Sequence, residues 1–154
     1  TSARSTGIPL IDFRTVLASN YRHGDLKLTH FQRNLIQNGW GEEGSPGTEF
    51  NPTVGPREGE LIITKQHEGP FVGTDLDQVL RRQDTHFLAV LGIPTRAAVR
   101  NIGTDGPNRF FDTIIVSDCC SDEDSQVHHV LLTYVLTHQS QVVTSDEILA
   151  GFSS

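Results

Sequence analysis

Polar side chains follow three apolar runs of the kind that form buried strands. Lys65 comes directly after Leu-Ile-Ile-Thr, Asp118 comes directly after Thr-Ile-Ile-Val-Ser, and Arg14 follows Ile-Pro-Leu-Ile-Asp-Phe. In α/β proteins the carboxyl ends of parallel strands meet at one edge of the sheet, and ligands bind there. We therefore expect these side chains near a binding crevice.

Lys65 has the most evident chemistry of this group. An ammonium group withdrawn from water either gains an anionic partner or has a lowered pKa. Taken alone, Lys65 fits two alternatives. The simpler one is a lysine at a strand end whose long side chain reaches water, and the other is a partly desolvated ammonium group in the crevice.

The turn Gly-Ile-Pro-Thr-Arg-Ala-Ala-Val, residues 92–99, has the form of a strand-to-helix junction that presents a nucleophile. Backbone N–H groups at such a junction can bind an oxyanion. The positions that could carry the nucleophile hold Ala97 and Ala98, and a methyl group cannot attack a carbon centre. The turn therefore predicts an active-site geometry without its reactive side chain.

Histidines and acids near these runs are assigned other roles. His67 and Glu68 follow Lys65 closely, but no HxxH or CxxC spacing supports a metal site, so we expect no metal. His128 and His129 are interpreted as structural residues of a helix. Asp118 is expected to cap the turn that follows it.

The segment after Asp118 is expected to be partly buried and partly solvated. Cys119 and Cys120 are interpreted as buried small apolar residues, and adjacent cysteines rarely pair with each other. The run Ser-Asp-Glu-Asp at residues 121–124 is interpreted as a solvated helix entry. Because there is no third cysteine, we expect no disulfide framework and a cytoplasmic location.

The elements that must position these residues alternate between strand and helix. Short apolar runs predict five strands, at residues 8–13, 61–64, 86–91, 113–117 and 141–143. Helices are predicted at residues 29–37, 74–82 with Thr74 as its cap, and 125–137 with Ser125 as its cap, and from residue 145. The second half of the chain thus predicts a doubly wound parallel sheet, with residues 20–59 as a long excursion.

Bulk properties exclude several classes of partner. The chain has 154 residues and a net charge of −7, which disfavours nucleic acid and anionic membranes because both require clustered Lys and Arg. No apolar run approaches the roughly 20 residues of a membrane-spanning helix. We expect one domain over residues 1–154. The chain begins with Thr and contains no Met, which suggests that the start of the protein has been removed.

The order of motifs resembles the isochorismatase-like hydrolases, also called the cysteine hydrolase superfamily. The family has a strand, a lysine, a phenylalanine and then Thr-x-Leu, a pattern matched by Lys65, Phe71, Thr74 and Leu76. Its next motif is Gly-[Val/Ile]-x-Thr-x-x-Cys-Val followed by an Asp, and then a strand ending in Asp with a later His. The residues that fit these two motifs are Gly92, Ile93, Thr95, Val99, Asp105, Asp118 and His128.

The resemblance implies a three-layer α/β/α fold with a mostly parallel sheet and a catalytic set of Asp, Lys and Cys without a cofactor. Lys65 would be the lysine and Ala98 stands at the cysteine position. Backbone amides of Ala97 and Ala98 would bind the oxyanion. Phe71, Pro94, Thr95 and Arg14 are expected to line the site. The family often has a cis peptide before its threonine, which implies one at Pro94–Thr95.

Two departures from the family pattern leave several functions open. Ala98 replaces the nucleophile, and the family's first strand, which carries the Asp, has no counterpart. The chain is then an enzyme that cleaves a vinyl ether without a cysteine, an amide hydrolase disarmed by a Cys-to-Ala change, or a non-catalytic relative that binds ligands or forms oligomers. In each case the expected ligand is a small molecule.

The missing strand also predicts an unusual sheet. The family strand order 3-2-1-4-5-6 places the first strand at the centre, so the strands at residues 8–13 and 86–91 would flank an empty position. Unpaired buried backbone groups cost about 1–3 kcal/mol each. We therefore expect an N-terminal fragment or a second subunit to fill the position, or the two flanking strands to pair directly.

Overall fold

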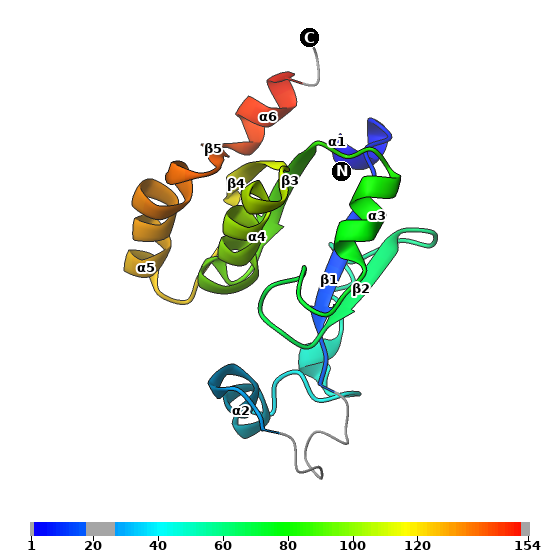
Figure 1. Ribbon diagram of the computed structural model, residues 1–154, viewed down its shortest axis with the longest axis vertical. Helices are drawn as coiled ribbons and strands as arrows, with labels where there is room; N and C mark the ends of the chain where they lie inside the picture. The colour runs from blue at the N-terminus through cyan, green and yellow to red at the C-terminus, as the bar shows by residue number, and fades with distance from the viewer. Residues whose placement is uncertain (1, 18–26, 152–154) are drawn as a thin grey trace. The chain divides into compact units, whose positions relative to one another are not determined.

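The structure is a computed structural model that describes residues 2–17 and 27–151 (Figure 1). It divides into two compact units, Thr1–Thr74 and Asp75–Ser154, and each is described here by itself. The part of Arg14–Arg22 beyond residue 17, which we expected near the crevice, lies outside the described residues. Within the described part of the chain, no helix is long and apolar enough to cross a membrane.

The first unit contains a parallel pair of strands, β1 (Ile11–Thr15) and β2 (Leu61–Lys65). Their register runs from Ile11 opposite Leu61 to Thr15 opposite Lys65. The unit also contains the short helix α1 (Ser2–Ser5), the helix α2 (His30–Gln37) and a 3-10 turn, η2 (Pro46–Thr48). Strand β1 begins later than predicted, whereas β2 extends the prediction by one residue to include Lys65.

Two local signals fix elements of the first unit. Thr29 and Gln32 form a capping box: the Gln32 amide donates to Thr29 Oγ1 at 3.3 Å, and the Thr29 amide donates to Gln32 Oε1 at 3.0 Å. The predicted helix from Thr29 is therefore confirmed. Arg4 Nε and Nη2 bind the Glu60 carboxylate at 2.6 and 2.8 Å, which connects α1 to the residue before β2.

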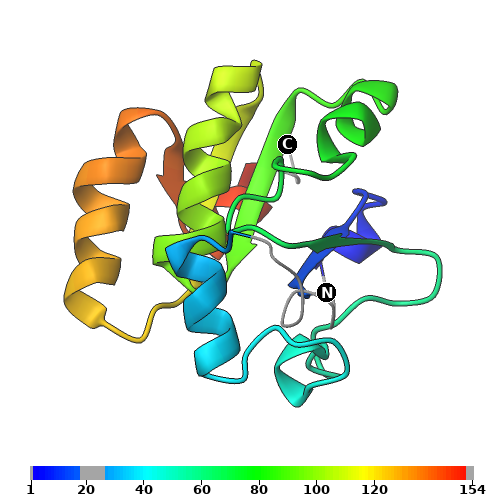
Figure 2. The same ribbon diagram turned by 60° about the horizontal axis from the view of Figure 1, so that its bottom comes forward.

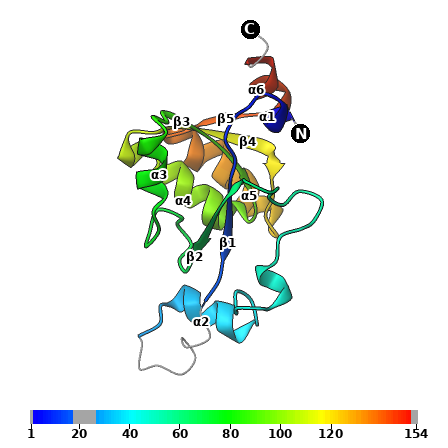
Figure 3. The ribbon, with the colours of Figure 1, turned by 90° about the vertical axis from the view of Figure 1, so that its right-hand side faces the viewer.

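The second unit has a three-stranded parallel sheet in the order β3-β4-β5, formed by Phe87–Gly92, Asp112–Cys120 and Gln141–Val143. Its helices are α3 (Leu76–Arg82), α4 (Arg100–Asp105), α5 (Ser125–Val130) and α6 (Ser145–Gly151). Figures 2 and 3 show α4 and α5 on one side of this sheet, with α6 on the other in Figure 3. The predicted α/β fold with parallel strands is confirmed.

Close packing sets α4 against the sheet. A Cβ atom at Gly103 would lie 2.7 Å from Leu136 Cδ2 and 3.3 Å from Ile115 Cδ1. Ile115 is fully buried and Leu136 is 1% exposed. Glycine at this position lets the helix approach the sheet closely enough for both side chains to fill the core.

The helix after β4 departs from its prediction. α5 continues as a π-helical segment, η5 (Leu131–Val135), and a 3-10 turn, η6 (Leu136–His138). The helical spacing of Val130, Tyr134 and Val135 would place them on one apolar face of the predicted helix, but they are 47%, 71% and 41% exposed. A π-turn advances the backbone by more residues per turn than an α-helix, so the 3.6-residue periodicity fails and Leu136 is buried instead.

Both predicted helix caps in the second unit are displaced by one residue. The N-cap of α3 is Asp75 rather than Thr74, whose hydroxyl instead donates to the Pro70 carbonyl at 2.5 Å. The N-cap of α5 is Asp124 rather than Ser125. The Asp124 carboxylate accepts from the amides of Gln126 and Val127, which satisfies two N–H groups at once.

The strands form two parallel sheets, β1-β2 in the first unit and β3-β4-β5 in the second. How the position between the two flanking strands is filled stays a prediction. Within the described part of the chain, β1 pairs with a neighbouring strand on only one of its edges, and so does β3.

Candidate active site

Lys65 is the last residue of β2 and is 5% exposed. Its Nζ donates to Thr15 Oγ1 at 2.7 Å and to the His67 carbonyl at 2.9 Å. The parallel register places Thr15 opposite Lys65, so the strand pairing itself brings the hydroxyl to the ammonium group. The alternative of a strand-end lysine that reaches water is wrong, because the side chain is buried.

Burial determines the proton affinity of this lysine. The pKa of Lys65 is lowered from 10.5 to about 8, mainly because burial disfavours the charged form, while Glu68 opposes the shift. Among the described residues no carboxylate forms an ion pair with Nζ. Lys65 is therefore cationic at neutral pH and close enough to its pKa to exchange a proton.

Two other predicted site residues lie in the same unit as Lys65. Phe71 is 6% exposed. Arg14 donates from Nε to Thr64 Oγ1 at 3.1 Å, and its guanidinium lies 6.0 Å from the centre of the Phe50 ring. Because side chains alternate along a strand, Arg14 and Thr64 lie on the face opposite Thr15 and Lys65. The structure does not bring Arg14 and Lys65 together.

The predicted turn begins at the end of β3 and leads into α4. Gly92 has φ +134°, a conformation that favours glycine. The cis peptide is Ile93–Pro94, so the position implied at Pro94–Thr95 is wrong by one residue. A proline nitrogen lowers the cost of the cis form, which favours it before Pro94 rather than after.

Thr95 anchors this turn and is fully buried. Its amide and its Oγ1 both donate to the Ser121 carbonyl, at 2.9 and 3.1 Å. Its Oγ1 also lies 2.8 Å from His128 Nδ1. His128 thus has the structural role that we predicted for it, with a specific partner that the sequence did not reveal.

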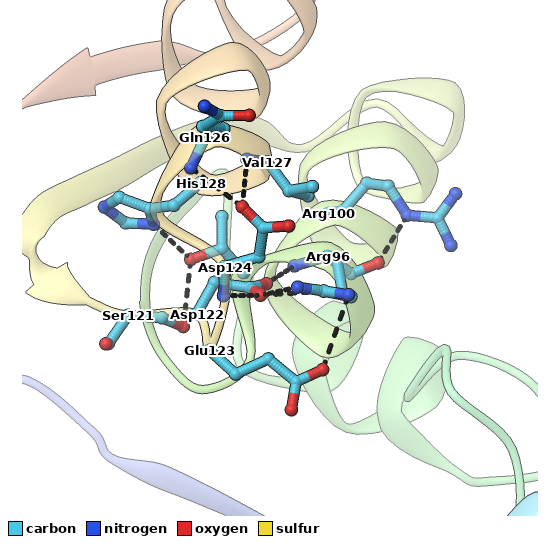
Figure 4. A network of polar contacts seen from close by, with 10 residues as sticks. Arg96, Arg100, Ser121, Asp122, Glu123, Asp124, Gln126, Val127 and His128 are labelled. Atoms are coloured by element: carbon cyan, nitrogen blue, oxygen red, sulfur yellow. Dashed lines mark hydrogen bonds and ion pairs between the residues drawn. The ribbon is translucent and has the colours of Figure 1, made fainter.

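Arg96 forms the second anchor of the turn (Figure 4). Its amide donates to Asp122 Oδ2 at 2.8 Å and its Nε donates to Asp122 Oδ1 at 2.7 Å. Nη1 of the same side chain lies 3.4 Å from Glu123 Oε1. The Asp122 side chain is fully buried, and the hydrogen bonds from Arg96 lower its pKa to about 2. The prediction of a solvated acidic run is therefore wrong at Asp122.

The two alanines lie in the π-helical segment Thr95–Val99, designated η3, directly before α4. The Ala97 amide donates to the Pro94 carbonyl at 3.1 Å. An oxyanion would have to share or replace this bond in order to use that amide. The role of Ala97 and Ala98 in oxyanion binding therefore stays a prediction, with Ala98 as the simpler donor.

Asp118 lies within β4 rather than after it, because the strand continues to Cys120. Its carboxylate accepts from the Ser145 amide at 2.7 Å and from the Ser145 hydroxyl at 2.6 Å. These bonds lower the pKa of Asp118. Asp118 thus caps the distant helix α6 rather than the turn that follows it.

The cysteines and the acidic residues add no further reactive centre. Cys120 is buried as predicted, but Cys119 is exposed, because successive side chains of a strand point to opposite faces. Burial raises the pKa of the Cys120 thiol to about 11, which disfavours the reactive thiolate. Within the described residues, no group of three or more His, Cys, Asp or Glu side chains could hold a metal ion.

Comparisons with known proteins agree with this arrangement. The sequence model of the isochorismatase domain family matches residues 1–147. The isochorismatase family protein YwoC of Bacillus subtilis is 29% identical over 113 residues, which are 73% of this chain and 60% of that protein. The maleamate amidohydrolase of Pseudomonas putida is 29% identical over 107 residues, which are 70% of this chain and 50% of that protein.

A solved structure extends the likeness to the fold. The crystal structure of a cysteine hydrolase from Pseudomonas syringae superposes with a TM-score of 0.85 and 24% identity, over 99% of this chain and 75% of that one. The chain belongs to the isochorismatase family. It spans between half and 60% of the length of the two curated relatives.

Proposed function

We propose that this chain is a hydrolase domain of the isochorismatase family, built for a small molecule with a C–N amide or vinyl-ether bond, and that it is inactive as written because Ala98 stands at the nucleophile position. The observation that carries the proposal is the buried Lys65 ammonium, which Thr15 and the His67 carbonyl hold at the end of β2. A cation in this environment attracts an anionic substrate group or a developing negative charge. The similarity to a maleamate amidohydrolase supports an amide or a related small molecule as substrate.

Ala98 limits the chemistry that this chain can perform. In the cysteine hydrolases that this chain resembles, the residue at the place of Ala98 is the cysteine whose thiol attacks the substrate carbon. A methyl group forms no covalent intermediate, so we expect no cysteine-based amidase activity from this sequence. Cys119 and Cys120 lie in β4, and we expect neither to replace the missing thiol.

A second candidate function follows from the same substitution. A family member without the nucleophile can bind a small molecule, or assemble with other copies, and release its ligand unchanged. The anchored turn supports this candidate, because Thr95 and Arg96 keep their partners although position 98 is inert.

Binding and turnover of a small panel distinguish these functions. We would titrate an unreactive anionic amide analogue and assay a primary amide and a vinyl ether with the unaltered chain, Lys65→Ala and Lys27→Ala. Lys27 is the only other lysine in the sequence and is exposed, which makes it a matched control. We expect weaker binding to Lys65→Ala alone. Equal affinity in all three proteins would contradict the assignment of Lys65.

Turnover of the vinyl ether by the unaltered chain would favour the cysteine-independent enzyme, whereas binding without turnover would favour the binding module.

A further inference from the structure

The protons around Thr95 can be assigned from its contacts. The Thr95 hydroxyl carries a single proton and lies within hydrogen-bond distance of the Ser121 carbonyl and of His128 Nδ1. A carbonyl only accepts, so the contact with Ser121 is a hydrogen bond when the hydroxyl proton points to it. We assign to His128 the tautomer with a proton on Nδ1, because both contacts of the hydroxyl are then hydrogen bonds. His128 thus orients the hydroxyl that binds the turn to residue 121.

Asp122 restrains the next residue of the turn in two ways. One carboxylate oxygen accepts the Arg96 amide at 2.8 Å and the other accepts Nε at 2.7 Å. The amide bond fixes the peptide plane two residues before position 98. The bond to Nε fixes the direction of the Arg96 side chain, whose Nη1 also lies beside Glu123 (Figure 4).

Burying the Asp122 carboxylate carries a free-energy cost that an ordinary surface contact does not have. The Asp122 side chain is fully buried, and a buried carboxylate is destabilising unless its partners satisfy it completely. Short-range polar contacts of this kind define a geometry rather than add to a hydrophobic core. They converge on Thr95 and Arg96, the residues immediately before Ala97 and Ala98.

We propose that Asp122 and His128 are positioning residues for position 98. Through Arg96 and Thr95 they hold the backbone between β3 and α4 so that a side chain at position 98 meets the amide groups at the start of the helical segment. The proposal rests on the proposed function, in which position 98 is where the family's nucleophile stands. A displacement of about 1 Å at such a position can cost on the order of a hundredfold in rate.

A thiol introduced at position 98 reports on this positioning without any substrate. In the Ala98→Cys protein, alkylation by iodoacetamide is followed at each cysteine by peptide mass spectrometry, with the exposed Cys119 as internal reference. Amides at a helix start lower the pKa of a thiol, so loss of the geometry raises it again. A rise of one pKa unit lowers the thiolate fraction, and hence the alkylation rate, about tenfold.

Asp122→Asn is the test variant in this background and Asp124→Asn is its control. Both remove one carboxylate from the same loop, but the Asp124 carboxylate accepts from the amides of Gln126 and Val127 in α5 and acts on Arg96 only through its charge. Asparagine is a comparably good cap. We expect Asp122→Asn to lower the rate at position 98 relative to Cys119 about tenfold, and Asp124→Asn to leave the ratio unchanged. Equal ratios in the two variants would overturn the role of Asp122.

A second pair of variants tests His128 and covers the case in which Asp122→Asn does not fold. Asparagine at residue 128 retains an N–H donor near the place of Nδ1, whereas leucine removes it. We expect His128→Asn to keep the alkylation ratio and His128→Leu to lower it severalfold. The same ratio in both would overturn the role of His128. If the thiol responds as expected but Lys65→Ala binds the anionic amide analogue as tightly as the unaltered chain, the proposed function fails and the positioning roles stand.

Discussion

Thr15 and Lys65 lie opposite each other at the paired ends of β1 and β2, and Lys65 Nζ donates to Thr15 Oγ1 at 2.7 Å. The strand register thus supplies a hydroxyl partner for an ammonium group that burial would otherwise leave poorly solvated. This partner is neutral, so the lysine keeps its positive charge available for an anionic group. The remaining effect of burial is seen in its pKa, which is lowered to about 8.

This lowered pKa predicts how stability depends on pH. Between the folded pKa of about 8 and the ordinary value of 10.5, the unfolded chain binds the lysine proton more tightly than the folded protein does. The free energy of unfolding therefore increases as pH rises through this range, by roughly 3 kcal/mol at most.

Urea unfolding from about pH 7 to about pH 10 measures this contribution. The unaltered protein should gain stability relative to Lys65→Met across the range, because methionine does not titrate. Lys27→Met serves as the control, since Lys27 is exposed, and should behave as the unaltered protein does. A constant difference between the unaltered protein and Lys65→Met would show that Lys65 has an ordinary pKa.

Asp122 predicts a dependence on pH of the same sign, but in the acidic range. Its pKa is lowered to about 2 by Arg96, so the ion pair stabilises the folded state above the unfolded pKa of about 4 and loses this effect as pH falls toward 2. Asp122→Asn should cost about 1–3 kcal/mol at neutral pH, because it removes charge-assisted hydrogen bonds in a buried place.

Thermal or urea unfolding of Asp122→Asn and Asp124→Asn at neutral and acidic pH checks this expectation. The cost of Asp122→Asn should shrink as the solution is acidified, whereas Asp124→Asn should remain close to the unaltered protein throughout. If the cost of Asp122→Asn is independent of pH, the ionised pair is not its source.

The apolar residues of β3 predict self-association or uptake of a further strand. Phe87 and Leu91 are 63% and 61% exposed, and exposed apolar strands favour pairing with another chain. We expect the 154-residue chain to form an oligomer, or to bind a complementing fragment. Light scattering should show a concentration-dependent mass that Leu91→Lys lowers. Val54→Lys is the control, because Val54 is 67% exposed and lies outside the strands. A monomer with a cooperative thermal transition at all concentrations would contradict this expectation.

The sequence predicted those features that depend on neighbours along the chain. Apolar runs identified all five strands to within a few residues, and the helix predicted from Thr29 is α2. Burial of Lys65 was one of the two alternatives that the preceding run Leu-Ile-Ile-Thr left open. The π-helical segment Leu131–Val135 could not be predicted, because no residue pattern distinguishes its onset from a continuing α-helix.

Features that depend on distant partners were missed. Arg96 and Asp122 are 26 residues apart, and Asp118 and Ser145 are 27 residues apart. Asp122 lies in a polar stretch that looks solvated in the sequence, and only the pairing of β3 with β4 brings it to the turn. The one available signal for Asp122 was an arginine inside an otherwise apolar turn, which requires an acidic partner when it is held close to the core.

The account depends most directly on the proposal that position 98 is a nucleophile position. Acylation of the Ala98→Cys protein by an activated ester, mapped by peptide mass spectrometry, tests it. The account predicts that position 98 acylates about tenfold faster than Cys119 at neutral pH, and that Asp122→Asn slows this reaction whereas Asp124→Asn does not. Acylation at position 98 no faster than at Cys119, and indifferent to Asp122, would contradict the account.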